Sequence, residues 1–354
     1  MPSPFSPFQL GRHTLTNRIA MAPMTRSRAP GEVANDLLTT YYAQRAGAGL
    51  VITEGTQPSV VGQGYPDTPG LHSDEQVESW RQVTDAVHEA GGVIFAQLMH
   101  AGRVGDPDLL PGDLIPVGPS AVAAQGQIYT HAGPKPFSTP HALTEDEIHQ
   151  TIDDFADAAA HAVQAGFDGV ELHGANGYLI QQFLASNANQ RTDGWGGNVE
   201  GRIRFAVEVA HAVAAKIGGE RVGLRISPSS TLHDVIEDEL ELTYKSLLAG
   251  ISALDLAYLH IMEAPAQREL TRELRAQWPG TLILNPNTYP ASTGPEALTL
   301  IEDGTADLIS FGAMFLANPD LPVRLRAGGP YNTPDPANFF GGDHTGYTDY
   351  PALT

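Results

Sequence analysis

Eight short apolar runs, separated by segments of helical character, constrain the fold of this sequence more than any other feature. They predict strands over residues 19–23, 49–55, 93–100, 169–174, 222–228, 254–262, 281–286 and 308–313. Strands that alternate with helices favour a parallel sheet, and strands that are apolar almost throughout are typical of a sheet covered on both faces. The predicted fold class is therefore α/β, as a (β/α)8 TIM barrel.

The clearest helix is expected over residues 144–165. Thr144 and Glu147 have the spacing of a capping box. One face of the helix carries the apolar side chains Ile148, Ile152, Phe155, Ala159 and Val163. An open doubly wound sheet is the weaker alternative, because no G-x-G-x-x-G motif opens a helix after the first strand.

A single barrel domain is expected over residues 1–354, since α/β barrels of this length occur as one unit. The segment 101–143 is rich in Pro and Gly and is too long for an ordinary connection between a strand and a helix. It therefore predicts an excursion or lid after the third strand. Residues 331–354 form a C-terminal tail.

The composition excludes several classes of function. With 41 acidic and 20 basic residues the formal charge is −21, so neither nucleic acid nor a membrane surface is expected as a partner. The chain has no cysteine, which excludes thiolate metal sites, iron–sulfur clusters and cysteine nucleophiles. No signal-peptide pattern or long apolar run is present, so we expect a cytoplasmic protein. The sequence leaves open whether it is a monomer or a homodimer.

The carboxyl ends of the strands hold the candidate site residues, because active sites of barrels lie at that end. The fourth strand leads to His173, Asn176 and Tyr178. His173 and Asn176 offer two neutral donors to one oxygen, which suits a carbonyl that gains negative charge during a reaction. Tyr178 could deliver a proton. Arg225, after the fifth strand, could stabilise an anion on a bound ring system.

Each of these residues also has an ordinary structural explanation. A single His in a loop is more often buried or capping than catalytic, and Asn beside Gly is common in turns. Tyr178 could simply lie on the rim of the barrel, and Arg225 could pair with a buried acid. The occurrence of such residues at successive strand ends favours the functional interpretation.

A metal-dependent hydrolase is a competing interpretation. His100, His173 and His260 follow the third, fourth and sixth strands, and three His residues can bind a metal. The first strand supplies no His pair, and Arg225 would place a fixed positive charge beside the ion. No metal site is therefore predicted.

Longer motifs extend over nearly the whole chain. They include NRIAMAPMTRSR (17–28), YYAQRAGAGLVITEGT (41–56), FDGVELHGANGYLIQQFL (167–184), VGLRISP (222–228), FLANPDLPVRL (315–325) and GYTDYP (346–351). In this order they resemble the Old Yellow Enzyme family of FMN-dependent ene-reductases. Thr25 stands where a subset of that family carries Cys, so the resemblance is to the classical branch.

The resemblance implies a set of cofactor contacts. Thr25 would bind the flavin carbonyl, Gln97 the pyrimidine edge, and Arg225 the N1 and O2 side of the reduced ring. Pro23, Met24 and Gly55 are further candidate cofactor-binding residues, and Asn287, Gly312 and Ala313 are the candidates at the phosphate end. The cofactors are FMN, held non-covalently, and NADPH or NADH as the reductant.

The resemblance also implies how substrate binds. His173 and Asn176 would hold the electron-withdrawing oxygen of an enone, enal or nitroalkene, and Tyr178 would protonate the α-carbon after hydride arrives from flavin N5. Met99 stands where Trp is common and should widen the substrate pocket. Tyr347, in the tail, is expected to approach that pocket.

The loops expected to hold the flavin phosphate depart from the family pattern. The family usually has a glycine pair after the seventh strand and Gly-Arg after the eighth, whereas this chain has LNPNTYP and FGAMF. Ala313 removes a guanidinium and Pro286 removes a backbone donor. Asn287 and the amides of Gly312 and Ala313 are the available replacements. One lost charge-assisted hydrogen bond would weaken FMN binding by roughly tenfold to a hundredfold.

The function expected from the resemblance is NAD(P)H-driven, flavin-dependent reduction of activated C=C bonds. The alternative keeps the barrel and the carbonyl-binding residues for a biosynthetic isomerisation or cyclisation, or for a cofactor other than FMN. A catalytically idle barrel that binds a small carbonyl compound is a third interpretation, and the complete set of candidate residues argues against it.

Overall fold

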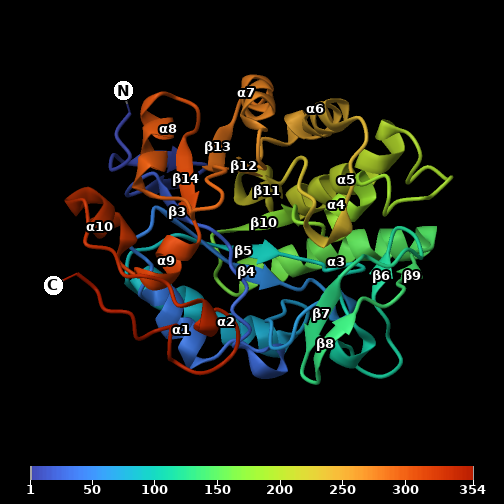
Figure 1. The fold of residues 1–354 in the computed structure, drawn as a ribbon, viewed down its shortest axis with the longest axis horizontal. Coiled ribbons are helices and arrows are strands. Elements are labelled where there is room, and N and C mark those ends of the chain that lie inside the picture. The colour runs from blue at the N-terminus through green and yellow to red at the C-terminus, as the bar shows by residue number, and fades with distance from the viewer. Residues whose placement is uncertain (1, 354) are drawn as a thin grey trace.

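A closed barrel of eight parallel strands forms the centre of the computed structural model, which describes residues 2–353 (Figure 1). In chain order the barrel strands are β3 (Ile19–Met21), β4 (Leu50–Thr56), β5 (Ile94–Leu98), β10 (Gly169–Gly174), β11 (Val222–Ile226), β12 (Tyr258–Met262), β13 (Thr281–Asn285) and β14 (Leu308–Phe311). Each predicted run overlaps one of these strands, and only β4 extends past its run, by one residue. The predicted (β/α)8 barrel is therefore confirmed.

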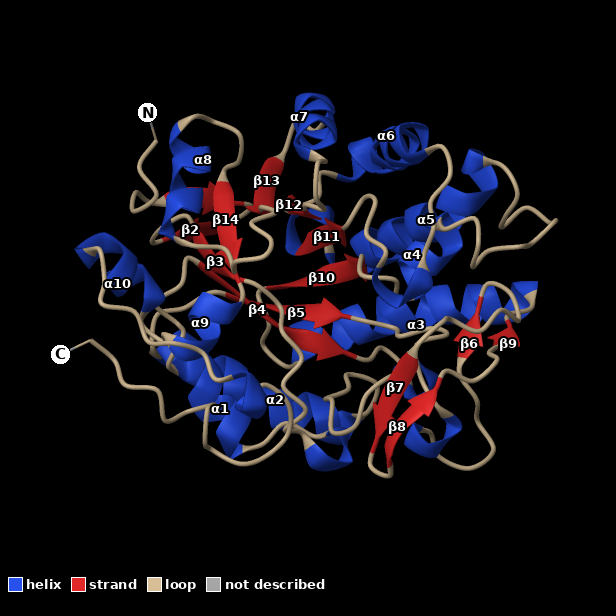
Figure 2. Ribbon diagram, viewed as in Figure 1, coloured by secondary structure: helices blue, strands red, loops and turns tan. Residues whose placement is uncertain are grey.

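Helices surround the barrel on its outer face (Figure 2). They are α1 (Asp36–Ala43), α2 (Asp74–Glu89), α3 (Glu145–Gln164), α4 (Leu179–Leu184), α5 (Val199–Ile217), α6 (Leu240–Ile251), α7 (Arg268–Gln277), α8 (Thr299–Glu302), α9 (Ala313–Ala317) and α10 (Leu321–Ala327). Helix α3 begins with the predicted capping box between Thr144 and Glu147. Among the described residues, no helix has the length and apolarity needed to cross a membrane.

The sixth strand is shorter than the sequence predicts. Ser252–Leu254 form a turn of 3-10 helix, and Asp255 takes a left-handed backbone conformation with φ of 48°. A left-handed residue cannot continue a strand, so β12 begins only at Tyr258.

The interior of the barrel is apolar at the amino ends of the strands. Strands β1 (Phe8–Leu10) and β2 (His13–Leu15) pair as an antiparallel hairpin. Leu10 and Leu15 of this hairpin join an apolar cluster with side chains from the barrel strands, including Ile52, Phe95 and Ile283. The hairpin therefore closes this end of the barrel, which leaves the carboxyl end for polar side chains.

The excursion over residues 101–143 contains two small sheets. Strand β6 (Val117–Gly118) pairs with β9 (His141–Ala142), and β7 (Gln127–Thr130) pairs with β8 (Gly133–Pro136). Leu109 and Ile128 of the excursion share an apolar cluster with Met99 and Tyr178. The excursion thus covers the side of the barrel on which Tyr178 lies.

Buried arginines hold the C-terminal tail against the carboxyl end of the barrel. Arg26 donates hydrogen bonds to the carbonyls of Phe339, Asn338 and Gly346, and Arg28 and Arg45 donate to further tail carbonyls. The ring of Tyr347 stacks on Tyr41 with centroids 4.1 Å apart. Because Arg26 directly follows Thr25, the tail fixes the loop after β3.

We expect Tyr347→Ala to lower the free energy of unfolding by about 3 kcal/mol or more, because it removes a fully buried aromatic ring. Urea unfolding followed by circular dichroism measures this loss. The control is Tyr129→Ala, whose side chain is 69% exposed and whose loss should cost less than about 0.5 kcal/mol. Equal stabilities for the two variants would contradict the structural role of the stacked ring.

Candidate active site

A left-handed turn after β10 brings the central candidate residues together. Asn176 and Gly177 have φ of 58° and 78°, and Asn and Gly tolerate this region best. A Cβ at Gly177 would lie 2.4 Å from the Leu232 carbonyl oxygen, so this position requires glycine. The Asn176 N–H donates to Ser227 Oγ at 2.8 Å. Asn176 therefore belongs both to the tight turn and to the candidate site.

His173 and Tyr178 lie in contact beside this turn, with ring centroids 5.0 Å apart. His173 is 4% exposed. Burial, with a further effect of the charge on Arg225, holds the pKa of His173 well below its usual value. His173 Nδ1 and Asn176 Oδ1 are buried and have no hydrogen-bond partner within residues 2–353. Such groups are costly unless a ligand or water completes them. Nδ1 of His173 can donate to a ligand oxygen when it carries the ring proton, whereas Oδ1 of Asn176 can only accept, so Asn176 would have to donate from its amide nitrogen.

Arg225 lies next to His173, because the two residues are register partners on β11 and β10. Its side chain is 4% exposed, and Nε has no partner among the described residues. Burial lowers the pKa of Arg225 and the carboxylate of Glu171 raises it. Arginine nonetheless stays charged in proteins. A buried cation with an unused donor suits an anionic ring edge.

Glu171 lies among the candidate residues although the sequence did not predict it. It is fully buried, and its Oε1 accepts a hydrogen bond from Gln97 Nε2 at 2.8 Å. Its Oε2 accepts from His260 Nδ1 at 2.8 Å. Burial would raise the pKa of Glu171, but His260, Arg225 and the hydrogen bonds outweigh burial and lower it. The signal in the sequence was one acid inside the apolar run GVELHG.

This arrangement orients Gln97. Because its amide nitrogen donates to Glu171, its amide oxygen is left to accept a hydrogen bond from a ligand. A ring N–H is the kind of donor that such an oxygen takes. The structure therefore fits the predicted contact between Gln97 and a pyrimidine edge.

The three histidines of the metal alternative do not form a metal site. Both ring nitrogens of His260 are used, one by Glu171 and the other by Ser310 Oγ at 2.9 Å. His100 Nδ1 accepts from the Gly102 N–H, and burial lowers the pKa of His100 to about 3. Within residues 2–353 no group of three or more His, Asp or Glu side chains could hold a metal ion.

The ends of β3 and β4 supply a half-exposed edge beside these residues. Pro23, Met24 and Thr25 are partly exposed, although they follow a buried strand. A Cβ at Gly55 would lie 2.5 Å from Met99 Sδ, so glycine allows Met99 to approach the barrel closely. Met99 in turn belongs to the apolar cluster of Tyr178. These residues form one edge of the candidate site, and their contacts with flavin and substrate stay predictions.

The end of β13 offers a phosphate group no backbone donor from Asn287. The Asn287 N–H donates to Glu263 Oε2 at 3.1 Å, and Glu263 also pairs with Arg268. The backbone of Asn287 is therefore committed elsewhere, and only its side-chain amide is left. Gly312 and Ala313 are half-exposed at the start of α9.

Tyr347 does not occupy the position expected of a substrate contact. Its ring is fully buried, is stacked on Tyr41 and lies 4.8 Å from the Arg26 guanidinium. This environment gives Tyr347 a role in attaching the tail, and the expected approach to substrate finds no support in it.

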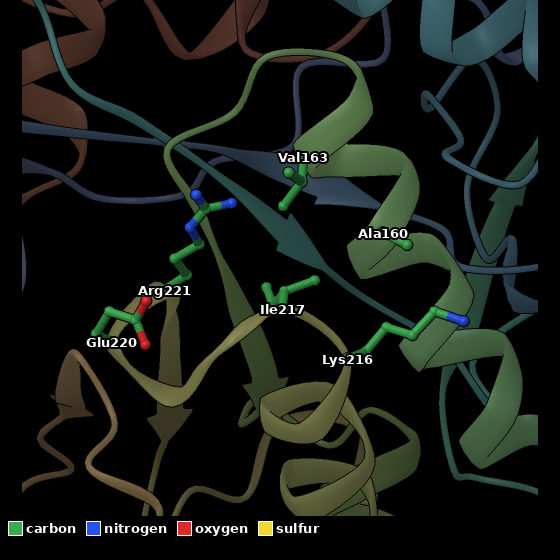
Figure 3. A pocket seen from close by; sticks show the side chains of 6 residues that line it. All are labelled: Ala160, Val163, Lys216, Ile217, Glu220 and Arg221. Carbon is green, nitrogen blue, oxygen red and sulfur yellow. The ribbon is translucent and has the colours of Figure 1, made fainter.

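A hollow of about 320 Å³ lies away from this site, at the amino ends of β10 and β11 (Figure 3). It is lined by Ala160, Val163, Lys216, Ile217, Glu220 and Arg221. Because active sites of barrels lie at the opposite end of the strands, we do not assign the reaction to this hollow.

The chain is similar to known proteins along nearly its whole length. The model of the NADH:flavin oxidoreductase / NADH oxidase family matches residues 3–332. A protein of Leishmania infantum named "Probable flavin mononucleotide-dependent alkene reductase" is 40% identical over 98% of this chain and 96% of its own. Morphinone reductase in complex with tetrahydroNAD is 44% identical, with a TM-score of 0.94 over 100% of this chain and 98% of its own. The Old Yellow Enzyme homologue of Zymomonas mobilis is 41% identical, with a TM-score of 0.94 over 99% and 100%.

We expect Glu171→Gln to lower the free energy of unfolding by about 1–3 kcal/mol, because it removes the charged acceptor of two buried hydrogen bonds. Urea unfolding measures the loss. Glu200→Gln, which changes the charge equally at an exposed position, is the matched control and should have little effect. A Glu171→Gln protein as stable as the control would show that the polar layer does not depend on this carboxylate.

Proposed function

The chain belongs to the NADH:flavin oxidoreductase / NADH oxidase family, the Old Yellow Enzyme family of flavin-dependent ene-reductases, and we propose that His173, Asn176 and Tyr178 bind and protonate its alkene substrate. The protein is an FMN-dependent oxidoreductase that uses NADPH or NADH to reduce activated C=C bonds. Bound FMN, once reduced, supplies a hydride to the β-carbon of the alkene.

Residues at the carboxyl ends of the strands would hold FMN. The buried and unpaired Arg225 Nε fits the electron-rich side of the ring, and the free oxygen of Gln97 fits its amide-like edge. Thr25 and the neighbouring Pro23 and Met24 form the half-exposed edge beside them. At the phosphate end the side chain of Asn287 and the amides of Gly312 and Ala313 are the remaining donors.

The observation that carries the proposal is the set of buried polar atoms without partners at one end of the barrel. His173 Nδ1, Asn176 Oδ1 and Arg225 Nε all belong to this set. If His173 donates from Nδ1 and Asn176 from its amide nitrogen, the two neutral groups stabilise the negative charge that the substrate oxygen gains when hydride reaches the β-carbon, and the Asn176 oxygen is left to accept from another group. They polarise the alkene without a proton transfer, since His173 stays neutral.

Tyr178 is the proposed proton donor to the α-carbon. Burial raises the pKa of Tyr178 to about 12, although the hydrogen bond with Tyr65 and the charge of Arg225 lower it in part. Tyr178 is therefore protonated at physiological pH. Its position beside His173 places the acid next to the groups that hold the substrate oxygen.

The proposed substrates are small enones, enals and nitroalkenes, with Met99 at the wall of the pocket. The relatives reported above do not carry names of isomerases or cyclases, so the non-reductive alternative gains no support from them. A single domain, a cytoplasmic location and a monomeric or homodimeric state stay predictions.

We expect Tyr178→Phe to slow oxidation of the reduced enzyme by 2-cyclohexenone about a hundredfold, because general acid catalysis typically contributes at least this factor. Reduction of the flavin by NADPH should stay near the wild-type rate. Stopped-flow absorbance of the two half-reactions separates these effects. Equal losses in both half-reactions would show that Tyr178 supports the flavin rather than protonates the alkene.

We expect Ala313→Arg to tighten FMN binding at least about tenfold, because a guanidinium forms charge-assisted hydrogen bonds with phosphate. Fluorescence titration of the apoprotein with FMN measures the dissociation constant. Ala132→Arg, on the exposed turn between β7 and β8, is the control for the change in net charge. If the two variants bind FMN alike, the phosphate does not lie at the end of β14.

A further inference from the structure

A chain of hydrogen bonds leads from Tyr178 toward the surface. The hydroxyls of Tyr178 and Tyr65 are 2.9 Å apart, and Tyr65 Oη lies 3.1 Å from His233 Nε2. His233 Nδ1 lies 2.6 Å from the backbone oxygen of Asn176. Tyr65 follows β4 and His233 follows β11, so the fold brings these residues together from distant parts of the sequence. Neither is needed by the mechanism above.

The direction of this chain follows from the tautomer of His233. A carbonyl oxygen can only accept, so Nδ1 of His233 must carry a proton. Burial lowers the pKa of His233, so the ring is neutral at neutral pH and Nε2 has a lone pair. Tyr65 then donates to Nε2, and the Tyr65 oxygen accepts from Tyr178. In this state the Tyr178 proton is directed at Tyr65 and away from the substrate.

A proton on His233 reverses the direction of the hydrogen bonds from His233 through Tyr65 to Tyr178. Protonated His233 donates from Nε2 to Tyr65, and the Tyr65 hydroxyl then donates to the Tyr178 oxygen. The Tyr178 proton is thereby released toward the substrate. A Tyr178 oxygen that has lost its proton would also keep a hydrogen bond from Tyr65, which lowers the cost of a buried negative charge.

The surroundings of His233 suit exchange of a proton with water. The His233 side chain is partly exposed, whereas Tyr178 is 8% exposed. The titratable and charged groups around His233 are Tyr65, Tyr178, His173, Arg103 and Asp234. The nearby Arg103 charge adds to burial in lowering the pKa of His233, and the hydrogen bond to Asn176 opposes both.

We propose that Tyr65 and His233 are positioning residues that relay a proton from water to Tyr178, so that each proton given to an alkene is replaced through His233. The inference rests on the proposed role of Tyr178 as the donor. When the Tyr178 O–H bond breaks and the α-carbon gains its C–H bond, the Tyr65 proton moves to the Tyr178 oxygen. The Nε2 proton of protonated His233 then moves to Tyr65, and the neutral His233 takes its next proton from water.

The test uses the holoenzyme and the variants Tyr65→Phe and His233→Asn. Asn suits position 233 because its backbone is left-handed, with φ of 55°. The rate constant for oxidation of the reduced enzyme by 2-cyclohexenone is measured by stopped flow between about pH 5 and 8. Tyr129→Phe and His131→Asn, both exposed on the hairpin of β7 and β8, are the matched controls.

The wild-type rate constant is expected to fall as the pH rises through the pKa of His233, because only protonated His233 directs the chain toward the substrate. The rate constant should fall at pH values below the ordinary histidine pKa of about 6.5, because burial lowers the pKa of His233. Tyr65→Phe and His233→Asn should be about tenfold slower at the acid end, with little dependence on pH. Reduction by NADPH should be unchanged in both.

Two results would overturn the relay. In the first, Tyr65→Phe and His233→Asn keep the wild-type pH profile and rates within about twofold of wild type, while Tyr178→Phe is slow. That result leaves Tyr178 as the donor and removes only the relay. The other is a fast Tyr178→Phe enzyme, which ends the proposed function and the relay together. ¹⁵N NMR of labelled histidine gives a readout independent of activity. The Nδ1-protonated tautomer is expected for His233 at neutral pH, and an Nε2-protonated ring would contradict the direction of the chain.

Discussion

The buried carboxylate of Glu171 is the group on which the polar end of the barrel depends. It accepts hydrogen bonds from Gln97 on β5 and from His260 on β12, and its charge offsets the nearby charge of Arg225. A buried cation without such compensation would be costly. One side chain thus orients the Gln97 amide, sets the tautomer of His260 and compensates the charge of Arg225.

The apolar contacts that close the barrel lie at the amino ends of the strands, and the polar candidate site lies at their carboxyl ends. The hairpin of β1 and β2 closes the apolar end, so the other end is free to hold polar side chains without partners. Arg26 holds the C-terminal tail against the loop that follows β3, and the left-handed turn at Asn176 and Gly177 connects the candidate residues His173 and Tyr178. Loops at this end can therefore carry function while the strands and the tail keep them in place.

The sequence predicted the barrel and most of the candidate site because both leave local signals. Alternating apolar runs identify the strands, and polar residues at strand ends identify the site, as with His173 and Arg225. Glu171 was missed, as were Tyr65 and His233, the partners of Tyr178. Tyr65 and His233 lie 113 and 55 residues from Tyr178 in the sequence and meet it only in the folded protein. The local pattern also could not show that Tyr347 stacks on Tyr41 or that Asp255 delays the start of β12.

The most direct test of the account is the visible absorption spectrum of the purified protein, recorded as isolated and after addition of excess FMN. The account predicts about one bound flavin per chain, with a band that NADPH bleaches under anaerobic conditions and that 2-cyclohexenone restores. A colourless protein that excess FMN cannot fill would contradict it. The buried unpaired atoms of His173, Asn176 and Arg225 would then have to serve a different ligand.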